Sequence, residues 1–238
     1  KVILTPKAEK AMGCYLKATE LAEANGWFLA RQFETDANAK IHANTTAQEI
    51  LNDFSDSALD YWVTGYGTGG TFSGVAQVLR EKRPETQIIL SEPSNAQLIE
   101  SGQQQERTAD GSPAGSHPAF QPHLIQGWTP DFIPQVLQQS IDAKRFDQLV
   151  PVDADDGIAA SRALAQKEGI FTGISGGSTF AVALQIAQTA KPGSVILCML
   201  PDTGERYLSS PLFEGVGEDM NADELALSLS TPSFHLNE

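Results

Sequence analysis

The sequence VTGYGTGGTFSGV, residues 63–75, decides the fold, because it passes from an apolar run through a glycine-rich loop into a helical pattern. A parallel strand that ends in such a loop and continues as a helix presents free backbone amides and the positive end of the helix dipole at one point. Glycines let the backbone approach a ligand closely, where a Cβ would intrude. The stretch therefore predicts an anion site, and a phosphate is the ligand that suits it.

The order of residues in the loop does not fit the two common nucleotide-binding patterns. The Walker pattern needs a Lys-Ser/Thr pair after the glycines, whereas Thr71 is followed here by Phe72. The dinucleotide pattern GxGxxG also fails, since Phe72 stands where its last glycine would be. One interpretation is a tight turn without a ligand. The interpretation that we favour is a site for the phosphate of a cofactor smaller than a nucleotide.

Apolar runs and helical periods alternate along the chain. The runs TQIILSEP (86–93), FDQLVPVD (146–153) and SVILCMLP (194–201) lack polar alternation, which indicates strands covered on both faces. KVILT (1–5) and GWFLARQF (26–33) are expected to be two further strands around a helix. This order predicts an α/β fold with a mainly parallel sheet flanked by helices.

The charge, the cysteines and the histidines of the chain limit the partners, compartments and metal sites that we expect. With 16 basic against 30 acidic residues the net charge is −14, which disfavours nucleic acid and anionic membranes. Cys14 and Cys198 have apolar neighbours, so buried free thiols and a reducing compartment are expected. This compartment is the cytoplasm, with an organelle such as a plastid as the alternative. His117, His123 and His235 share no ligand spacing, and we predict no metal site.

Four motifs in order resemble cysteine synthase, the pyridoxal-phosphate-dependent O-acetylserine sulfhydrylase. They are RQFETDANAKIHANTTAQEI (31–50), GTGGTFSGV (67–75), EGIFTGISGGS (168–178) and LPDTGERYLSSPLFEG (200–215). The resemblance runs from residue 1 to about residue 215 and is interrupted at 100–122. It implies a fold type II enzyme of the kind found in the tryptophan synthase β chain, with pyridoxal 5′-phosphate as cofactor.

The resemblance also implies roles for individual residues. It assigns the cofactor phosphate to Gly67, Thr68, Gly69, Gly70 and Thr71, and the contact with the pyridine nitrogen to the hydroxyl of Thr203. A neutral hydroxyl does not keep that nitrogen protonated, which favours elimination and replacement at Cβ over transamination. Gln32 and Gly127 are expected to bind substrate, although Trp128 departs from the family's small residues. Thr45 or Thr46 with Glu49 is expected to cap a helix beside His42, which gives His42 a structural role.

One component of the family's site is missing. None of the lysines lies in the motif of the Schiff-base lysine, so we expect no catalytic residue in this chain. We expect a fragment without the N-terminal part, divided into residues 1–34 from a smaller domain and residues 35–215 as the larger cofactor domain. A polar insertion at 100–122 and an acidic tail at 216–238, draped over the surface or partly disordered, complete the division.

The function implied for the intact protein is synthesis of L-cysteine from O-acetylserine and sulfide. A homodimer is implied too, and serine acetyltransferase is the protein partner that the resemblance suggests. Cystathionine β-synthase and serine/threonine dehydratase are the alternatives of the same fold. A truncated, non-catalytic paralogue that binds an enzyme is the alternative from another class.

Overall fold

The centre of the molecule is a parallel sheet, shown by a computed structural model that describes residues 1–230. Its strands are β1 (Tyr61–Gly65), β2 (Gln87–Pro93), β3 (Gln148–Val152) and β4 (Ile196–Cys198). They lie in the order β3-β2-β1-β4, and every neighbouring pair is parallel. The predicted α/β fold with a mainly parallel sheet is therefore confirmed.

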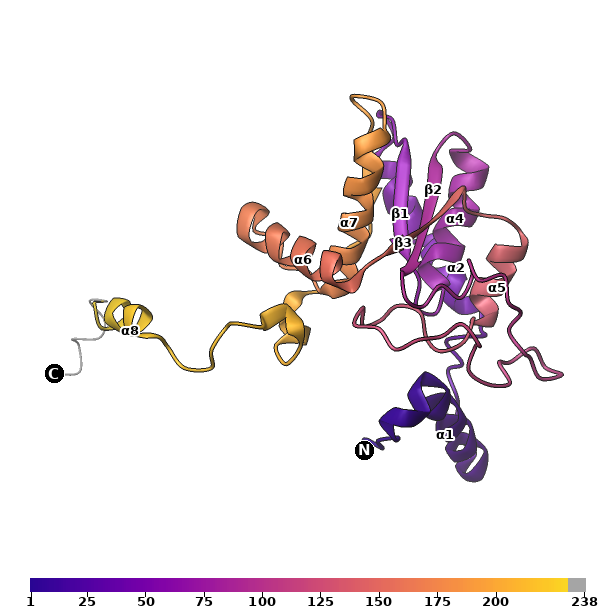
Figure 1. Cartoon of the computed structure of the whole chain (residues 1–238). Coiled ribbons are helices and arrows are strands. Elements are labelled where there is room, and N and C mark those ends of the chain that lie inside the picture. The colour runs from indigo at the N-terminus through magenta and orange to yellow at the C-terminus, as the bar shows by residue number, and fades with distance from the viewer. Residues whose placement is uncertain (231–238) are drawn as a thin grey trace.

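Helices cover both faces of this sheet (Figure 1). One face carries α2 (Asp36–Asn44), α3 (Thr46–Asp53), α4 (Gly70–Lys82) and α5 (Gln135–Asp142). The other face carries α6 (Ala154–Glu168) and α7 (Ile174–Thr189). Of these helices, α2 was not expected from the sequence, whose apolar periodicity there is weak.

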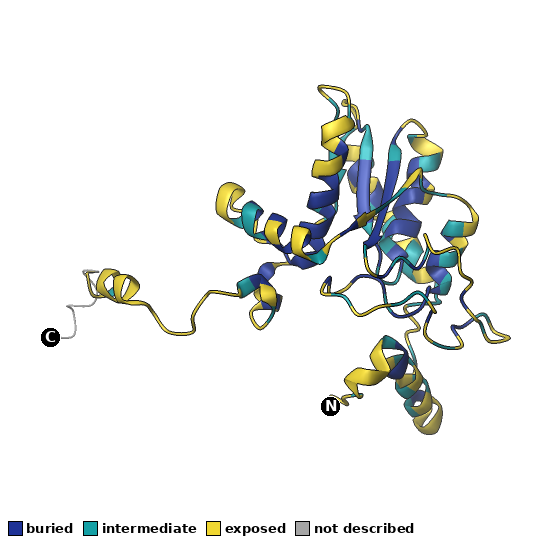
Figure 2. Cartoon of the chain, viewed as in Figure 1, coloured by how far each residue is buried: buried dark blue, intermediate teal, exposed yellow. Residues whose placement is uncertain are grey.

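Successive side chains of each strand point to opposite faces of the sheet, which gives the molecule one apolar core on each face. Trp62 and Ile88 point toward the α4 side and are fully buried, whereas Val63 and Ile89 are buried against the α6 and α7 side. Figure 2 shows the buried residues concentrated in the sheet and in the helix faces that meet it. Burial on both faces explains why these strands read as continuous apolar runs.

The N-terminal segment differs from the prediction. The expected helix is present as α1 (Lys10–Asn25), preceded by the short 3-10 turn Lys7–Glu9. The two strands expected at 1–5 and 26–33 are wrong, because neither segment pairs with another strand within residues 1–230. A β-branched run becomes a strand only where a neighbour satisfies its backbone groups. Helix α1 lies apart from the sheet (Figure 1), and Cys14, expected to be buried, is exposed on it.

The insertion at 100–122 contains no helix or strand, as expected, but it is anchored to the body. His117 is 2 % exposed, and its amide donates to the carbonyl of Asp131. The amide of Ile133 donates to the side-chain oxygen of Gln105 at 3.0 Å. The segment is therefore a packed loop that follows the body closely. We infer that these polar contacts replace the apolar core that the segment lacks.

The C-terminal segment contains one more helix after the 3-10 turns Gly204–Tyr207 and Pro211–Phe213. Helix α8 (Ala222–Leu229) starts at a capping box formed by Asn221 and Glu224. It lies well away from the sheet (Figure 1), so the expectation of a tail draped over the surface is wrong for residues 216–230. His235 lies outside the described residues. No helix within residues 1–230 is long and apolar enough to cross a membrane.

We predict that Gly177→Ala destabilises the protein. A Cβ at Gly177 would lie 2.1 Å from the carbonyl oxygen of Gly157, where α6 and α7 cross. Because that obstacle is backbone, the helices must separate, at a cost of about 1–3 kcal/mol. Urea unfolding measures the change. Gly115→Ala is the control, since a Cβ there meets nothing within 4 Å; equal stability of the two variants would contradict the prediction.

Candidate functional site

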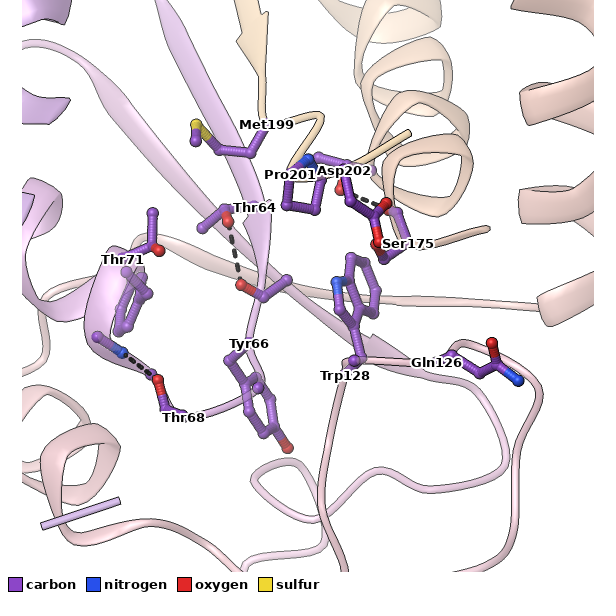
Figure 3. Close-up of a pocket in the computed structure, with 17 residues that line it drawn as sticks. Thr64, Tyr66, Thr68, Thr71, Gln126, Trp128, Ser175, Met199, Pro201 and Asp202 are labelled. Carbon is purple, nitrogen blue, oxygen red and sulfur yellow. Dashed lines mark hydrogen bonds between the residues drawn. The ribbon is translucent and has the colours of Figure 1, made fainter. Parts of the chain in front are cut away.

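A partly open cavity of about 330 Å³ lies where β1 and β4 end (Figure 3). Ligands of open parallel sheets bind at this carboxyl edge. Four segments converge on it: the loop after β1, a segment from the middle of the chain, the start of α7 and the residues after β4. The lining consists of residues 64–72 and 126–128 with Ser175, Thr179, Met199, Pro201 and Asp202.

The glycine loop is shaped by close contacts that no larger residue allows. Gly69 has a left-handed φ of +83° and is the N-cap of α4. A Cβ at Gly69 would lie 2.6 Å from Cβ of Leu137, and a Cβ at Gly67 would lie 2.3 Å from the carbonyl oxygen of Gly127. The glycines are therefore required by packing as well as by the approach of a ligand.

The loop offers unpaired donors at the start of a 13-residue helix. Within residues 1–230, the amides of Gly67, Thr68, Gly69 and Thr71 donate to no other group. The Gly70 amide donates to the hydroxyl of Thr68 at 3.2 Å. Unpaired amides together with the positive end of a helix dipole form a site for an anion such as phosphate.

Helix α2 holds the two threonine hydroxyls of this loop. Asn38 donates through Nδ2 to the hydroxyl of Thr68 at 2.9 Å. His42 lies between the hydroxyls of Thr71 and Thr46, at 3.2 and 2.9 Å from its Nε2 and Nδ1. Burial lowers the pKa of His42, so a neutral ring donates to one hydroxyl and accepts from the other. The expected capping by Thr45 or Thr46 with Glu49 is wrong: α3 has no side-chain cap, the Thr45 hydroxyl donates to a carbonyl of α2, and the Thr46 hydroxyl contacts His42.

The opposite end of the cavity carries a hydroxyl and a carboxylate. Ser175, in the first turn of α7, is 3 % exposed. The hydroxyl of Tyr207 donates to Oδ2 of Asp202 at 2.6 Å, while Oδ1 of Asp202 is buried with no partner among the described residues. Burial, reinforced by Asp202, raises the pKa of Tyr207 to about 12, so this phenol stays protonated. The cavity is thus rich in amide donors at one end and in oxygen atoms at the other.

A buried polar pair supports the loop from behind. Tyr66, between two of the loop glycines, donates from its hydroxyl to Oε2 of Glu92 at 2.8 Å. Glu92 is fully buried and also accepts the amides of Ile99 and Glu100 at 3.1 and 3.0 Å. Burial raises the pKa of Glu92, and these hydrogen bonds counteract part of that rise. The pair ties the loop after β1 to the end of β2.

The structure brings together most, but not all, of the residues expected at the site. The loop Gly67–Thr71 and Gly127 line the cavity. Gln32 and Thr203 are exposed and are not in the lining; Gln32 contributes only its carbonyl, which accepts from Asn38 at 2.8 Å. The roles of all these residues stay predictions.

Sequence reasoning did not single out Ser175, Asp202 or Asn38. Ser175 lies within the GISGGS motif, where a polar residue before two small ones at a helix start was the available signal. Asp202 and Asn38 gave no such signal. No lysine lines the cavity, and within residues 1–230 no group of three or more His, Cys, Asp or Glu could hold a metal ion.

Comparison with known proteins now identifies the family. The model of pyridoxal-phosphate dependent enzymes matches residues 1–202. The chain belongs to this family. Enzymes of the family use pyridoxal 5′-phosphate, so the predicted cofactor and the fold type II assignment are confirmed.

The chain is similar to two curated proteins of different names. It is 47 % identical to the O-ureido-L-serine synthase of Streptomyces lavendulae, over 98 % of this chain and 65 % of that protein. It is 36 % identical to a cysteine synthase of Staphylococcus aureus, over 90 % of this chain and 62 % of that protein. A crystal structure of O-ureido-L-serine synthase superimposes with a TM-score of 0.82 at 47 % identity, covering 95 % of this chain and 65 % of that one. The chain thus spans slightly less than two thirds of the relatives that it matches.

The cavity fits the phosphate of this cofactor. The unpaired amides of the glycine loop are donors for an anion. A Cβ at Gly67 would collide with the carbonyl oxygen of Gly127 and so disturb this loop. We therefore expect Gly67→Ala to lower the affinity for pyridoxal 5′-phosphate at least about tenfold, the loss of one charged hydrogen bond or more. A spectroscopic titration of the apoprotein measures it. An affinity equal to that of the Gly115→Ala control would contradict a phosphate site here.

The substitution Tyr66→Phe tests the buried hydrogen bond between Tyr66 and Glu92 through the pH dependence of stability. Because the Tyr66 hydrogen bond lowers the pKa of Glu92, its loss raises that pKa further above the unfolded value of 4.5. At a pH low enough to protonate Glu92 in both the folded and the unfolded protein, a raised folded-state pKa does not change the free energy of unfolding. The loss of stability is largest at a pH above the folded-state pKa, where Glu92 is ionised in both states. We expect a loss of about 1–3 kcal/mol in the free energy of unfolding at a pH where Glu92 is ionised in both folded proteins, shrinking as the pH falls through their raised pKa values, which lie above 4.5.

Tyr61→Phe is the control for this variant. Tyr61 is the first residue of β1, the strand that leads into the loop of Tyr66, and its hydroxyl forms no hydrogen bond within residues 1–230. Chemical unfolding at a series of pH values compares the two variants. A loss for Tyr66→Phe that is independent of pH would contradict an ionised Glu92 as its partner.

Proposed function

We propose that the intact protein catalyses replacement at Cβ of an O-activated L-serine, with O-acetyl-L-serine as the donor. The observation that carries this proposal is the cavity, which has unpaired amide donors at one end and a hydroxyl beside the carboxylate of Asp202 at the other. Ser175 is a hydroxyl that lines the cavity at this end, and Thr203 is the one that the resemblance assigns. Either hydroxyl suits a pyridine nitrogen that stays unprotonated, which favours chemistry at Cβ.

The residues of this chain would bind and orient the cofactor and the amino-acid substrate. The unpaired amides of Gly67, Thr68, Gly69 and Thr71 would hold the phosphate, while Asn38 and His42 hold the hydroxyls of Thr68 and Thr71. When bound, pyridoxal 5′-phosphate supplies the electron sink that makes the α-proton acidic and the Cβ substituent a leaving group. Gly127, which lines the cavity, would contact the amino-acid substrate. Gln32 would reach it only after a rearrangement of residues 26–33.

We favour an oxygen nucleophile as the second substrate. The relative of higher identity is named for O-ureido-L-serine, whose ureido group is joined to Cβ through oxygen. N-hydroxyurea is the nucleophile that gives this product from O-acetylserine: the bond from Cβ to the acetate oxygen breaks, a bond from Cβ to the hydroxyurea oxygen forms, and acetate and a proton leave. Sulfide, which gives L-cysteine, is the second candidate, supported by similarity to cysteine synthase.

The remaining machinery is proposed to lie outside these residues. The cavity has no lysine in its lining, and we infer that the Schiff-base lysine belongs to protein sequence beyond this chain. A homodimer and an association with serine acetyltransferase are proposed from the resemblance to cysteine synthase, and a cytoplasmic location is proposed from the two cysteines. A non-catalytic paralogue would instead lack that lysine in the full gene.

An assay of the full-length protein tests the proposal. It is loaded with pyridoxal 5′-phosphate and given O-acetyl-L-serine with N-hydroxyurea or with sulfide, and mass spectrometry follows O-ureido-L-serine, L-cysteine and acetate. We expect acetate release with either nucleophile and a higher kcat/KM for N-hydroxyurea. Turnover only of L-serine with homocysteine, which gives cystathionine and water and no acetate, or turnover of none of these substrates, would contradict the proposal.

A further inference from the structure

The wall of the cavity contains a tryptophan seated on a glycine. A Cβ built on Gly65 would lie 1.9 Å from Cε2 of Trp128, 2.1 Å from Cζ2 and 2.4 Å from Cδ2. The indole is therefore in contact with the backbone at the end of β1. It is 8 % exposed and lines the cavity, where Figure 3 shows it between the end of β1 and the oxygen end formed by Ser175 and Asp202.

The backbone around Trp128 cannot withdraw easily. The amide of Thr129 donates to the carbonyl of Tyr66 at 2.7 Å, and the carbonyl of Gly127 lies against Gly67. Thr129 adopts a φ of +37° although it is not a glycine, and it is 1 % exposed. Strain of this kind persists only where the surroundings enforce one conformation. The indole is thus held on both sides, by its own backbone and by Gly65.

The space that this indole leaves is small. The cavity of about 330 Å³ is near the lower end of the range for ligand pockets, roughly 300–1,000 Å³. A cofactor and an amino-acid substrate must share it if the proposed function is right. Tryptophan has the largest of the natural side chains, so the position of Trp128 decides how much room is left on its side of the cavity.

We propose that Trp128 is a specificity-determining residue, which limits the size of the group that can be joined to Cβ of the amino acid. This inference rests on the proposed function and narrows it to small nucleophiles, of which N-hydroxyurea and sulfide are examples. Gly65 is its structural counterpart, because only a residue without a side chain lets the indole occupy this place. The pair of residues, and not Trp128 alone, sets the width of the cavity.

Ligand binding tests the limit without turnover. Dissociation constants of S-methyl-, S-propyl- and S-benzyl-L-cysteine for the full-length protein loaded with cofactor are read from the visible absorbance of the cofactor. In Trp128→Ala the ratio of the benzyl to the methyl constant should fall about tenfold or more, the scale on which an apolar pocket discriminates by size. Leu184→Ala, at an α7 side chain that is 49 % exposed and outside the lining of the cavity, should leave the ratio unchanged.

A second pair of variants removes the ambiguity of misfolding. Gly65→Ala should displace the indole in the wild-type background and shift the ratio, but should have no further effect in Trp128→Ala, where the ring that it meets is gone. Trp128→Phe, which keeps an aromatic ring on Gly65, should give an intermediate ratio. An unchanged ratio in folded Trp128→Phe and Trp128→Ala, or equal effects of Gly65→Ala in both backgrounds, would overturn the inference.

The same ligands separate this inference from the proposed function. If the size ratio changes as expected but no acetate is released from O-acetyl-L-serine, the proposed function is wrong and Trp128 still limits the pocket. If acetate is released and the ratio does not change, the function stands and the size limit does not.

Discussion

The candidate site depends on one close approach between two stretches of backbone. The loop after β1 passes residues 127–129 with no room for side chains at Gly65 or Gly67, and a hydrogen bond from Thr129 to Tyr66 fixes the distance. This contact places the unpaired amides of the loop at the start of α4 and forms the wall of the cavity at the same time. A single constraint therefore shapes both the amide-rich end of the cavity and its width.

The part of this arrangement that is local in sequence could be predicted. A buried parallel strand, a run of glycines and an amphipathic helix follow one another, so β1, the loop and α4 could be predicted from residues 63–75. The anion site follows because backbone amides at a helix start need no distant partner. The same holds for the parallel sheet, whose strands are recognisable by their continuous apolar runs.

The part that depends on distant contacts could not be predicted. His42 and Asn38 reach the loop from α2, a helix with weak periodicity, and Asp202 reaches the cavity from beyond β4. The strands predicted at the N-terminus are absent because an apolar run indicates that a segment can form a strand, but does not show whether a neighbouring strand is present to pair with it. Trp128 was noticed as a departure from small residues, but its contact with Gly65 is visible only in three dimensions.

We propose that the loop Gly67–Thr71 holds the phosphate of pyridoxal 5′-phosphate. A crystal structure of the full-length protein loaded with the cofactor would test this contact. We predict phosphate oxygens within hydrogen-bond distance of the amides of Gly67, Thr68, Gly69 and Thr71, with the Thr71 hydroxyl still in contact with His42. A phosphate bound elsewhere, with these amides facing solvent or another part of the protein, would contradict the account.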